Sequence, residues 1–169
     1  GAALGKLSAT RAVLEAGAGE EGSTRTQREA GNTSAVGITR AVLLTIRGRA
    51  GYFCAGLVDG PTVDVDGNAG WGFGDNLVNG LLRVAGSAGA VCGVAMRSGH
   101  ILVRGDVGSR AGQVMKGGTL ICTGNAGFRA GSMMMGGILV ILGDAQEDLG
   151  EFIMDGEIFV AGKIESIGQ

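Results

Sequence analysis

Hydrophobic and polar positions repeat along most of the chain with a period of nineteen residues. One glycine marks position 0 of each repeat, at Gly48, Gly67, Gly86, Gly105, Gly124, Gly143 and Gly162. The side chains two, ten, fifteen and seventeen residues after this glycine are apolar in nearly every repeat. At position 15 they are Val63, Leu82, Ile101, Leu120, Leu139 and Ile158. Because positions 15, 17, 0 and 2 are spaced by two residues, as on one face of a strand, each repeat predicts a short strand.

Nineteen residues hold two or three short strands and tight corners, but no helix of useful length. Such repeats, here called rungs, stack into a parallel β-helix, with successive rungs about 4.8 Å apart. Glycine also recurs at positions 3, 7 and 13. We expect these glycines at corners, where φ is positive or where close backbone approach leaves no room for Cβ. A left-handed β-helix of hexapeptides repeats every eighteen residues, so the period of nineteen favours a right-handed, single-stranded β-helix of about seven rungs.

The first 40 residues lie outside the repeat. The segment LSATRAVLEAG predicts a short helix, with Ser8 as its N-cap and Gly17 after its end. The Gly-, Ser- and Thr-rich residues that follow, up to 37, predict a flexible linker. Since Leu44 and Ile46 occupy positions 15 and 17 before Gly48, the β-helix is expected to cover 41–169. Its last rung has no polar capping segment, which predicts a surface that a partner covers.

Composition narrows the class of protein. The chain has 169 residues, including 35 glycines and one proline, and lacks the Gly-X-Y register of collagen. Abundant apolar residues argue against disorder, and a net charge of -2 gives no reason to expect binding to nucleic acid or to an anionic membrane. No apolar run approaches the length of a membrane span, and the first residues do not resemble a signal peptide. Three cysteines without a CxxC motif fit a reducing compartment, so a cytoplasmic location is expected.

No catalytic, cofactor-binding or metal-binding residue is predicted. The GWGFG tract at 70–74 lacks the Gly-Lys-Ser/Thr and the helix of a phosphate loop, so its glycines are interpreted as corner residues. His100, the only histidine, precedes the inward Ile101 and should face outward. Cys54 and Cys92 share position 6 but lie two rungs apart, beyond disulfide reach. Cys122 stands at apolar position 17 and behaves as a small hydrophobic residue.

Interaction surfaces are the remaining candidates. Three successive apolar residues, 133–135, lie one rung below another three, 152–154. In each group, at most two of the three side chains can point inward. The alternatives are an exposed stripe or a locally widened core. The sixth rung is acidic and predicts either a solvated face or a docking surface for a basic partner. The candidate interface comprises Val78, Met135, Met154, Asp148 and Glu151. One further column, at position 4, predicts an aromatic stack or a rim facing a partner and contains Tyr52, Trp71 and Phe128.

The glycine columns in segments 51–80, 105–131 and 143–164, of which GYFCAGLVDGPTVDVDGNAGWGFGDNLVNG is the clearest, resemble the GXGXG family. This right-handed β-helix is found as the C-terminal domain of the glutamate synthase large subunit. The resemblance covers 41–169. Because that domain occupies most of this chain, the chain is most similar to the separate GXGXG subunit of N-methylglutamate synthase.

That resemblance implies a non-catalytic scaffold in a flavin-dependent complex that converts methylamine and glutamate to N-methylglutamate and ammonia. It implies no cofactor on this chain, with FMN and an iron–sulfur cluster on a partner subunit. The expected partners are a class II glutamine amidotransferase subunit and an FMN-binding, glutamate synthase-like subunit, in a hetero-oligomer with several copies. The alternatives are the β-helical subunit of a formylmethanofuran dehydrogenase or formyltransferase–hydrolase complex, which shares the repeat, and a stand-alone structural solenoid.

Overall fold

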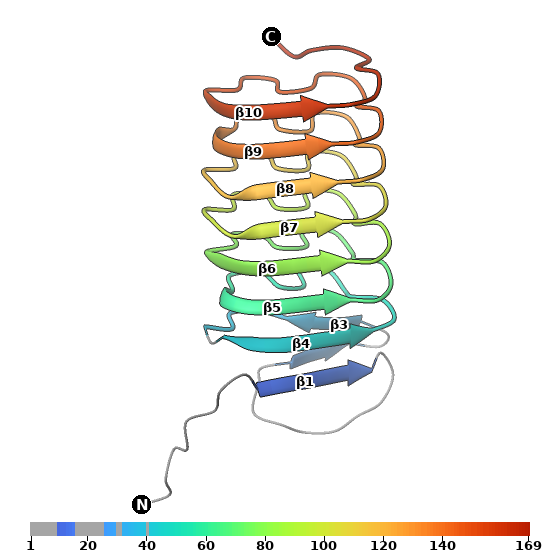
Figure 1. Cartoon of the computed structure of the whole chain (residues 1–169), viewed down its shortest axis with the longest axis vertical. Coiled ribbons are helices and arrows are strands. Elements are labelled where there is room, and N and C mark those ends of the chain that lie inside the picture. Colours follow the sequence, from blue (N-terminus) through green and yellow to red (C-terminus); the bar gives the residue numbers. More distant parts are fainter. Residues whose placement is uncertain (1–9, 16–25, 30–31, 40) are drawn as a thin grey trace, which may run out of the picture.

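The computed structural model describes residues 10–15, 26–29, 32–39 and 41–169, and it contains strands and turns but no helix within them. Eight strands form one parallel sheet in the order β1-β4-β5-β6-β7-β8-β9-β10, and two more form an antiparallel hairpin (Figure 1). The strands are β1 Thr10–Glu15, β2 Thr26–Glu29, β3 Asn32–Ala35, β4 Val42–Arg47, β5 Asp59–Val65, β6 Asn79–Val84, β7 His100–Val103, β8 Thr119–Cys122, β9 Met135–Ile141 and β10 Asp155–Val160.

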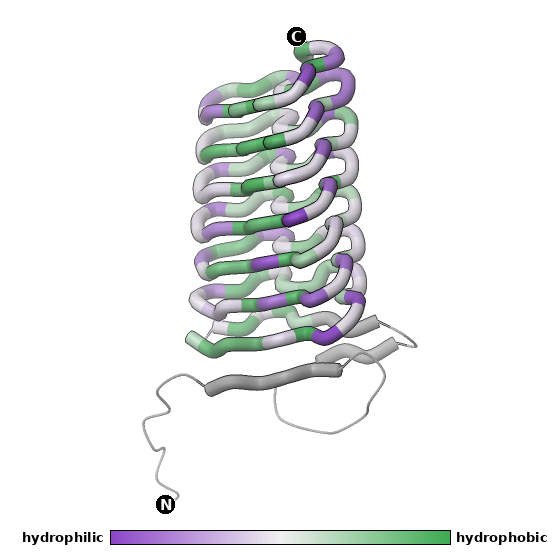
Figure 2. The backbone as a smooth tube through the Cα atoms, turned by 45° about the vertical axis from the view of Figure 1, so that its right-hand side comes forward, coloured by the Kyte–Doolittle hydropathy of each residue, from purple (hydrophilic) through white to green (hydrophobic). Residues whose placement is uncertain are grey.

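From β4 onward the chain coils as the period predicts. In Figure 1 the strands cross the near side from left to right while the chain climbs from its N-terminal to its C-terminal end, which is a right-handed coil. The strands pair in the expected register: Leu120 lies opposite Ile101 on one side and Leu139 on the other. Figure 2 shows similar hydropathy recurring turn after turn, with hydrophilic residues at the corner that follows most of the strands. The right-handed β-helix is therefore confirmed.

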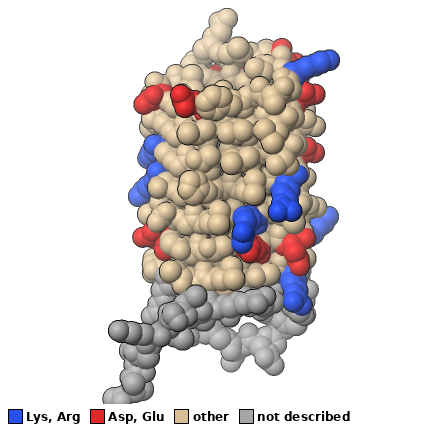
Figure 3. Space-filling view, in the orientation of Figure 1, with Lys and Arg blue, Asp and Glu red and all other residues tan. Residues whose placement is uncertain are grey.

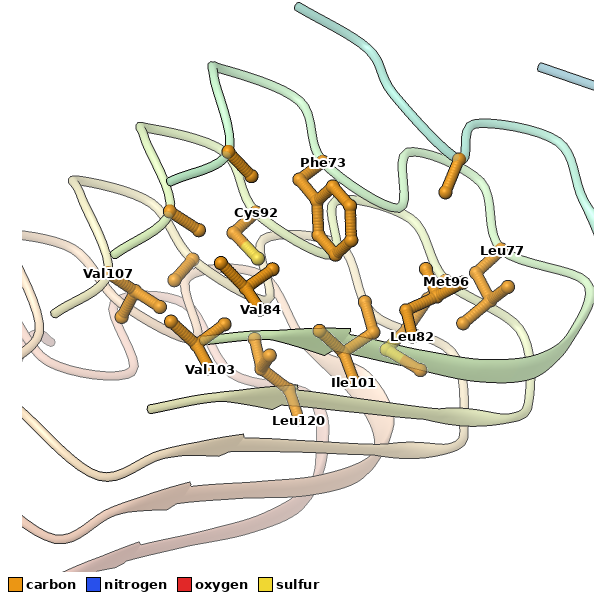
Figure 4. Close-up of a cluster of buried hydrophobic side chains, with 14 of the residues drawn as sticks. Phe73, Leu77, Leu82, Val84, Cys92, Met96, Ile101, Val103, Val107 and Leu120 are labelled. Carbon is orange, nitrogen blue, oxygen red and sulfur yellow. The ribbon is translucent and has the colours of Figure 1, made fainter. Parts of the chain in front are cut away.

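Four predicted columns line the interior. Side chains at positions 2, 10, 15 and 17 are buried in most rungs, as Figure 4 shows for one part of the core. Position 6 forms a fifth buried column, which the sequence pattern had not identified as core; its members are Cys54, Phe73, Cys92, Ala111, Ala130 and Leu149. Each buried Leu, Ile, Val, Met or Phe side chain stabilises the fold by about 1.5–3 kcal/mol. The stability of the core therefore comes from the repetition of these side chains in successive rungs.

Both expected roles of glycine are present. A Cβ on Gly124, at position 0, would lie 2.8 Å from the carbonyl carbon and oxygen of Gly105 in the rung below, so close backbone approach excludes a side chain. Gly112, at position 7, has a φ of +69°, and there a Cβ would meet its nearest neighbours at 3.7 Å. Gly124 is therefore required for space, whereas Gly112 is favoured for its backbone conformation.

The helix predicted around Ser8 to Gly17 is wrong in its described part, since Thr10–Glu15 is strand β1. Its backbone pairs in parallel with β4, with Ala12 opposite Leu44 and Leu14 opposite Ile46. A helix of about ten residues is marginal alone, whereas the free edge of β4 offers a row of backbone hydrogen-bond partners. The spacing of Ala12 and Leu14 was the strand signal. Ser8 and Gly17 lie outside the described residues.

Part of the predicted flexible linker is also structured. β2 and β3 pair as an antiparallel hairpin across residues 26–35. The Ala55 amide donates a hydrogen bond to the Ala35 carbonyl, and the Gly37 amide donates to the Gly56 carbonyl at 2.8 Å. Ala35 is buried in the same core as the rungs. Stacking therefore extends below the expected boundary at residue 41.

Candidate functional site

Outward side chains on the turn side of the solenoid are positioned by an unusual backbone. Positions 5, 7 and 9 have positive φ, as at Arg110, Gly112 and Val114. The Arg110 amide donates to the Phe128 carbonyl in the rung above at 2.9 Å, while the Gly112 amide donates to the Cys92 carbonyl in the rung below at 2.8 Å. This alternation gives backbone amides of the turn side hydrogen-bond acceptors in the rungs above and below. It directs position 6 inward and leaves positions 4, 5 and 9 available to form an outer surface.

Near the N-terminal end, this surface carries an aromatic patch, defined here as Tyr52, Phe53, Leu57 and Trp71. All four side chains are more than half exposed. The rings of Tyr52 and Trp71 meet edge to face, with centroids 6.1 Å apart. They border a surface hollow of about 380 Å³ that Arg49 also lines. Exposed apolar side chains gathered in this way indicate a contact surface.

The column at position 4 is only partly an aromatic stack. Ala90 and Ser109 occupy this position between Trp71 and Phe128. Phe128 instead has the Arg110 guanidinium over its ring, 5.2 Å from the centroid. The structure therefore brings together two of the three predicted aromatic residues.

A second exposed surface lies toward the C-terminal end and is called here the methionine ridge: Met133, Met135, Phe152 and Met154. Their exposed fractions range from 40% to 64%, whereas Met134 between them is fully buried. Position 10 thus points inward in this rung, while positions 9 and 11 point outward. Met135 and Met154 of the candidate interface lie in adjacent rungs. Val78 shares their position but is separated from them by the rungs of Arg97 and Lys116.

The acidic residues of the candidate interface lie beside a basic side chain. Asp148 and Glu151 both contact the Arg129 guanidinium, at 3.3 and 3.2 Å. The Asp144 carboxylate accepts a hydrogen bond from the Lys163 amide at 2.7 Å. The acidic residues of the sixth rung are therefore divided between the ion pair of Asp148 and Glu151 with Arg129, the corner contact of Asp144 and the exposed positions of Glu147, Asp155 and Glu157.

That corner contact belongs to a polar ladder at position 1, which sequence reasoning missed. The Asn125 side-chain oxygen accepts from the Asp144 amide at 2.8 Å, and the Asp106 carboxylate accepts from the Asn125 amide at 2.7 Å. Ser87 and Asn68 continue the ladder toward the N-terminus. The signal was the run of Asn, Ser and Asp in one column, since such side chains accept from neighbouring backbone amides.

The cysteines are free and buried. Burial raises the pKa of Cys54 to about 11 and that of Cys92 to about 12. The Cys122 thiol donates to the Gly105 carbonyl at 3.2 Å, and burial also raises its pKa. Reactive or ligating cysteines are thiolates. Among the described residues, no three His, Cys, Asp or Glu side chains gather as metal ligands. The donor set of this part of the chain does not fit an iron–sulfur cluster.

Two further sequence predictions are confirmed. His100 is exposed at the start of β7. In the GWGFG tract, Gly72 and Gly74 both have a φ of +70°, so they are corner glycines.

Over the described ranges, no helix has the length and apolar character needed to cross a membrane.

Comparison with known proteins finds one local similarity of note. The chain is 48% identical over 46 residues to Protein GlxC of Rhizobium meliloti (strain 1021), a match that covers 27% of this chain and 20% of that protein. The chain thus matches about a fifth of the length of this relative. No protein-family model matches the chain, and no solved structure does. Together with the nineteen-residue glycine register, the local match supports the resemblance to the GXGXG repeat in its broad sense.

Proposed function

We propose that this chain is a non-catalytic scaffold subunit of a glutamate-synthase-like, flavin-dependent complex that forms N-methylglutamate from methylamine and glutamate. The observation that carries the proposal is a β-helix with a nineteen-residue glycine register, whose described residues include two exposed apolar surfaces and only buried thiols. The local similarity to Protein GlxC adds support for the broad family. In this proposal the nitrogen-transfer chemistry belongs to partner subunits.

The two surfaces suit two different partners. The aromatic patch lies on the rungs of β5 and β6, whereas the methionine ridge lies on those of β9 and β10, so the two are separated along the solenoid (Figure 1). Aromatic residues such as Trp71 dominate the binding energy of interfaces, and methionine adapts to varied partner shapes. We assign one surface to a class II glutamine amidotransferase subunit and the other to a subunit carrying FMN and an iron–sulfur cluster. Met135 and Met154 keep their place in the interface as part of the ridge.

The test is purification of the native complex through a tag on this chain. The proposal expects a glutaminase-type partner, a flavin spectrum and faster turnover with methylamine than with ammonia. A colourless preparation with a zinc-bearing partner would instead assign the chain to a formyl-transfer complex. Recovery of this chain without any partner would overturn the scaffold proposal.

Two variants test the assignment of surfaces. Trp71→Ala and Phe152→Asn should each weaken the capture of a different partner by roughly 30-fold, the effect of losing an interface hot spot. Asn suits position 152 because Phe152 has a φ of +55°, which Asn tolerates better than most residues. Lys163→Ala, on an exposed site outside both surfaces, is the matched control. If both variants release the same partner, the two-surface arrangement is wrong.

A further inference from the structure

The outward face of the parallel sheet is polar near its N-terminal end and apolar near its C-terminal end. At position 16, Asp64 on β5 and Arg83 on β6 form an ion pair at 2.6 Å. On β7 to β10 the same position holds Leu102, Ile121, Val140 and Phe159, paired in register from strand to strand. Figure 3 shows this side of the molecule, with uncharged surface over the centre of its middle and upper part and charged groups toward the edges.

We define the strand-face patch as the outward apolar residues of this region: Leu102, Ile121, Ile138, Val140, Leu142 and Phe159. Phe159 is 53% exposed and Leu142 is 51% exposed. Leu102, Ile121 and Val140 are half-buried by their neighbours along the ladder. Outward strand positions of a solvated sheet alternate as polar residues, so four apolar residues in one column indicate a surface that is covered.

Charges surround the patch unevenly. On its strand side, the rung of β7 carries three exposed basic residues and no acidic one: Arg97, His100 and Arg104. The rung of β10 carries exposed Asp155 and Glu157. Between them, the strand side of the β8 rung has one charged residue, Lys116, and that of the β9 rung has none. One end of the patch is basic and the other is acidic.

We propose that the strand-face patch binds a second copy of this chain in antiparallel orientation. A two-fold axis parallel to the strands, between β8 and β9, exchanges β7 with β10 and β8 with β9. It places Ile121 opposite Val140 of the second copy and His100 opposite its Glu157. It also brings Arg97 close to Asp155 of the second copy. The opposite charges of Arg97 and Asp155 then meet at both ends of the isologous interface.

The alternative two-fold axis, along the solenoid, is disfavoured by charge. It reverses the order of positions within each rung, so position 14 faces position 18. Arg97 would then no longer face Asp155 of the second copy, and Glu157 would have no basic partner. Only the antiparallel arrangement makes the patch self-complementary.

The available area suffices for a dimer of modest affinity. Four rungs about 4.8 Å apart and eight residues of about 3.3 Å each cover roughly 500 Å² per copy. The pair would bury about 1,000 Å², which is near the lower limit for a specific interface. We therefore expect a dissociation constant in the micromolar range. This inference does not depend on the identity of the hetero-partners proposed above.

Sedimentation velocity of the full chain, from about 1 to 200 μM, tests the proposal over the range in which a micromolar dimer forms. We expect a monomer of 16.9 kDa in equilibrium with a dimer. Ile121→Glu, which buries a charge at the centre, should weaken dimerisation at least about 100-fold. Thr62→Glu, an outward substitution on β5 beyond the overlap, is the matched control and should leave dimerisation unchanged. Equal melting temperatures of Ile121→Glu and Thr62→Glu at low concentration would exclude misfolding as the cause.

Charge exchange tests the orientation. Arg97→Glu and Asp155→Arg should each weaken the dimer roughly 10-fold by placing like charges together, and the double variant should recover most of the loss. Within one copy these residues lie three rungs, or about 14 Å, apart, so recovery reports contact between copies. The proposal is overturned if the chain remains monomeric at 200 μM, if Ile121→Glu dimerises normally, or if the double variant stays weak.

Discussion

The strand side and the turn side of each rung both donate backbone hydrogen bonds to neighbouring rungs, but they do so with different backbone conformations. On the strand side, extended residues such as Leu120 and Ile121 alternate between core and surface through the ordinary pleat. On the turn side, Arg110, Gly112 and Val114 have positive φ, and the residues between them do not. A single repeat period can therefore join two backbone conformations. Only the extended one has an alternating pattern of polar and apolar residues that is readily recognised in a sequence.

The two sides meet at position 7. A Cβ on Gly112 would point toward the Leu120 and Leu139 side chains of the strand side, both at 3.7 Å. In the rung below, a Cβ on Gly93 would lie 3.4 Å from Leu120 Cδ2. In the rung above Gly112, a Cβ on Gly131 would lie 2.5 Å from Ile158 Cδ1, so there the missing side chain gives the strand residue room in the interior. The turn-side glycine is part of core packing as well as of the backbone turn.

Substituting a glycine that is needed for space should lower the free energy of unfolding more than substituting one that is needed for backbone conformation. Gly124→Ala should lower the free energy of unfolding by about 3 kcal/mol or more, since its Cβ would press on the Gly105 backbone 2.8 Å away. Gly112→Ala should cost only about 1–2 kcal/mol, the penalty of a left-handed alanine, because the space is available. Ala55 already occupies position 7 at a φ of +58°. Urea denaturation of both variants measures the difference, and equal losses would contradict the two roles.

The strand side was predictable because its signal is local and chemical. Leu82, Ile101 and Leu120 alternate with outward residues, and their register followed directly from the nineteen-residue period. The turn side was located by its glycines, but its inward column was not recognised. The residues on either side of Phe73 and Cys92 at position 6 do not alternate between polar and apolar, because the sign of φ changes after each residue of this turn. A period-two pattern cannot describe a segment whose φ changes sign.

The second prediction compares buried thiols on the two sides at alkaline pH. Cys92 on the turn side has a pKa of about 12 in the folded chain against an ordinary value of 9.0, because burial disfavours the thiolate. Since the folded state holds this proton more tightly, its contribution is fully present below pH 9 and is lost as pH rises toward 12. At pH 11 the loss should be about 2–3 kcal/mol relative to pH 8.

The measurement is the difference in unfolding free energy between the wild type and Cys92→Ala at pH 8 and at pH 11. The wild type should lose more stability than the variant over this interval. Cys122→Ala is the strand-side comparison and should show a smaller alkaline effect, because hydrogen bonds from the backbone of Gly124 and Val107 offset part of the effect of burial on the pKa of Cys122. A Cys92→Ala variant with the full alkaline loss would show that this thiol is not the cause.

The third prediction concerns the corner that joins the two sides. Asn125→Ala removes the acceptor for the Asp144 amide and should cost about 1 kcal/mol, the net value of one hydrogen bond at an exposed site. Gln146→Ala, an exposed residue in the next rung, is the control and should change stability by less than about 0.5 kcal/mol. Thermal unfolding measures both. Equal midpoints would mean that water replaces the side chain at this corner.

The candidate docking surfaces were less predictable than the fold because exposure depends on the turn backbone. The sequence identified Met135 and Met154, which the structure places on the methionine ridge. It did not identify Phe152, which is 60% exposed at position 9 of the turn side. The prediction for Asp148 and Glu151 lacked Arg129, which lies one rung away at position 5 and contacts both. Contacts between columns require knowledge of side-chain direction, which a repeat period does not supply.

The smallest expected effect tests whether left-handed residues on the turn side are strained. Val91, at position 5, has a φ of +53°, where a β-branched side chain is unfavourable, and it is only partly buried. Val91→Asn should raise the free energy of unfolding by about 0.5–1 kcal/mol, since asparagine tolerates this conformation. The same change on the strand side, Ile121→Asn, should not stabilise the monomer, because extended backbone favours β-branched residues. A destabilised Val91→Asn would show that contacts of the valine outweigh its backbone strain, and the residue type at position 5 would then be set by packing.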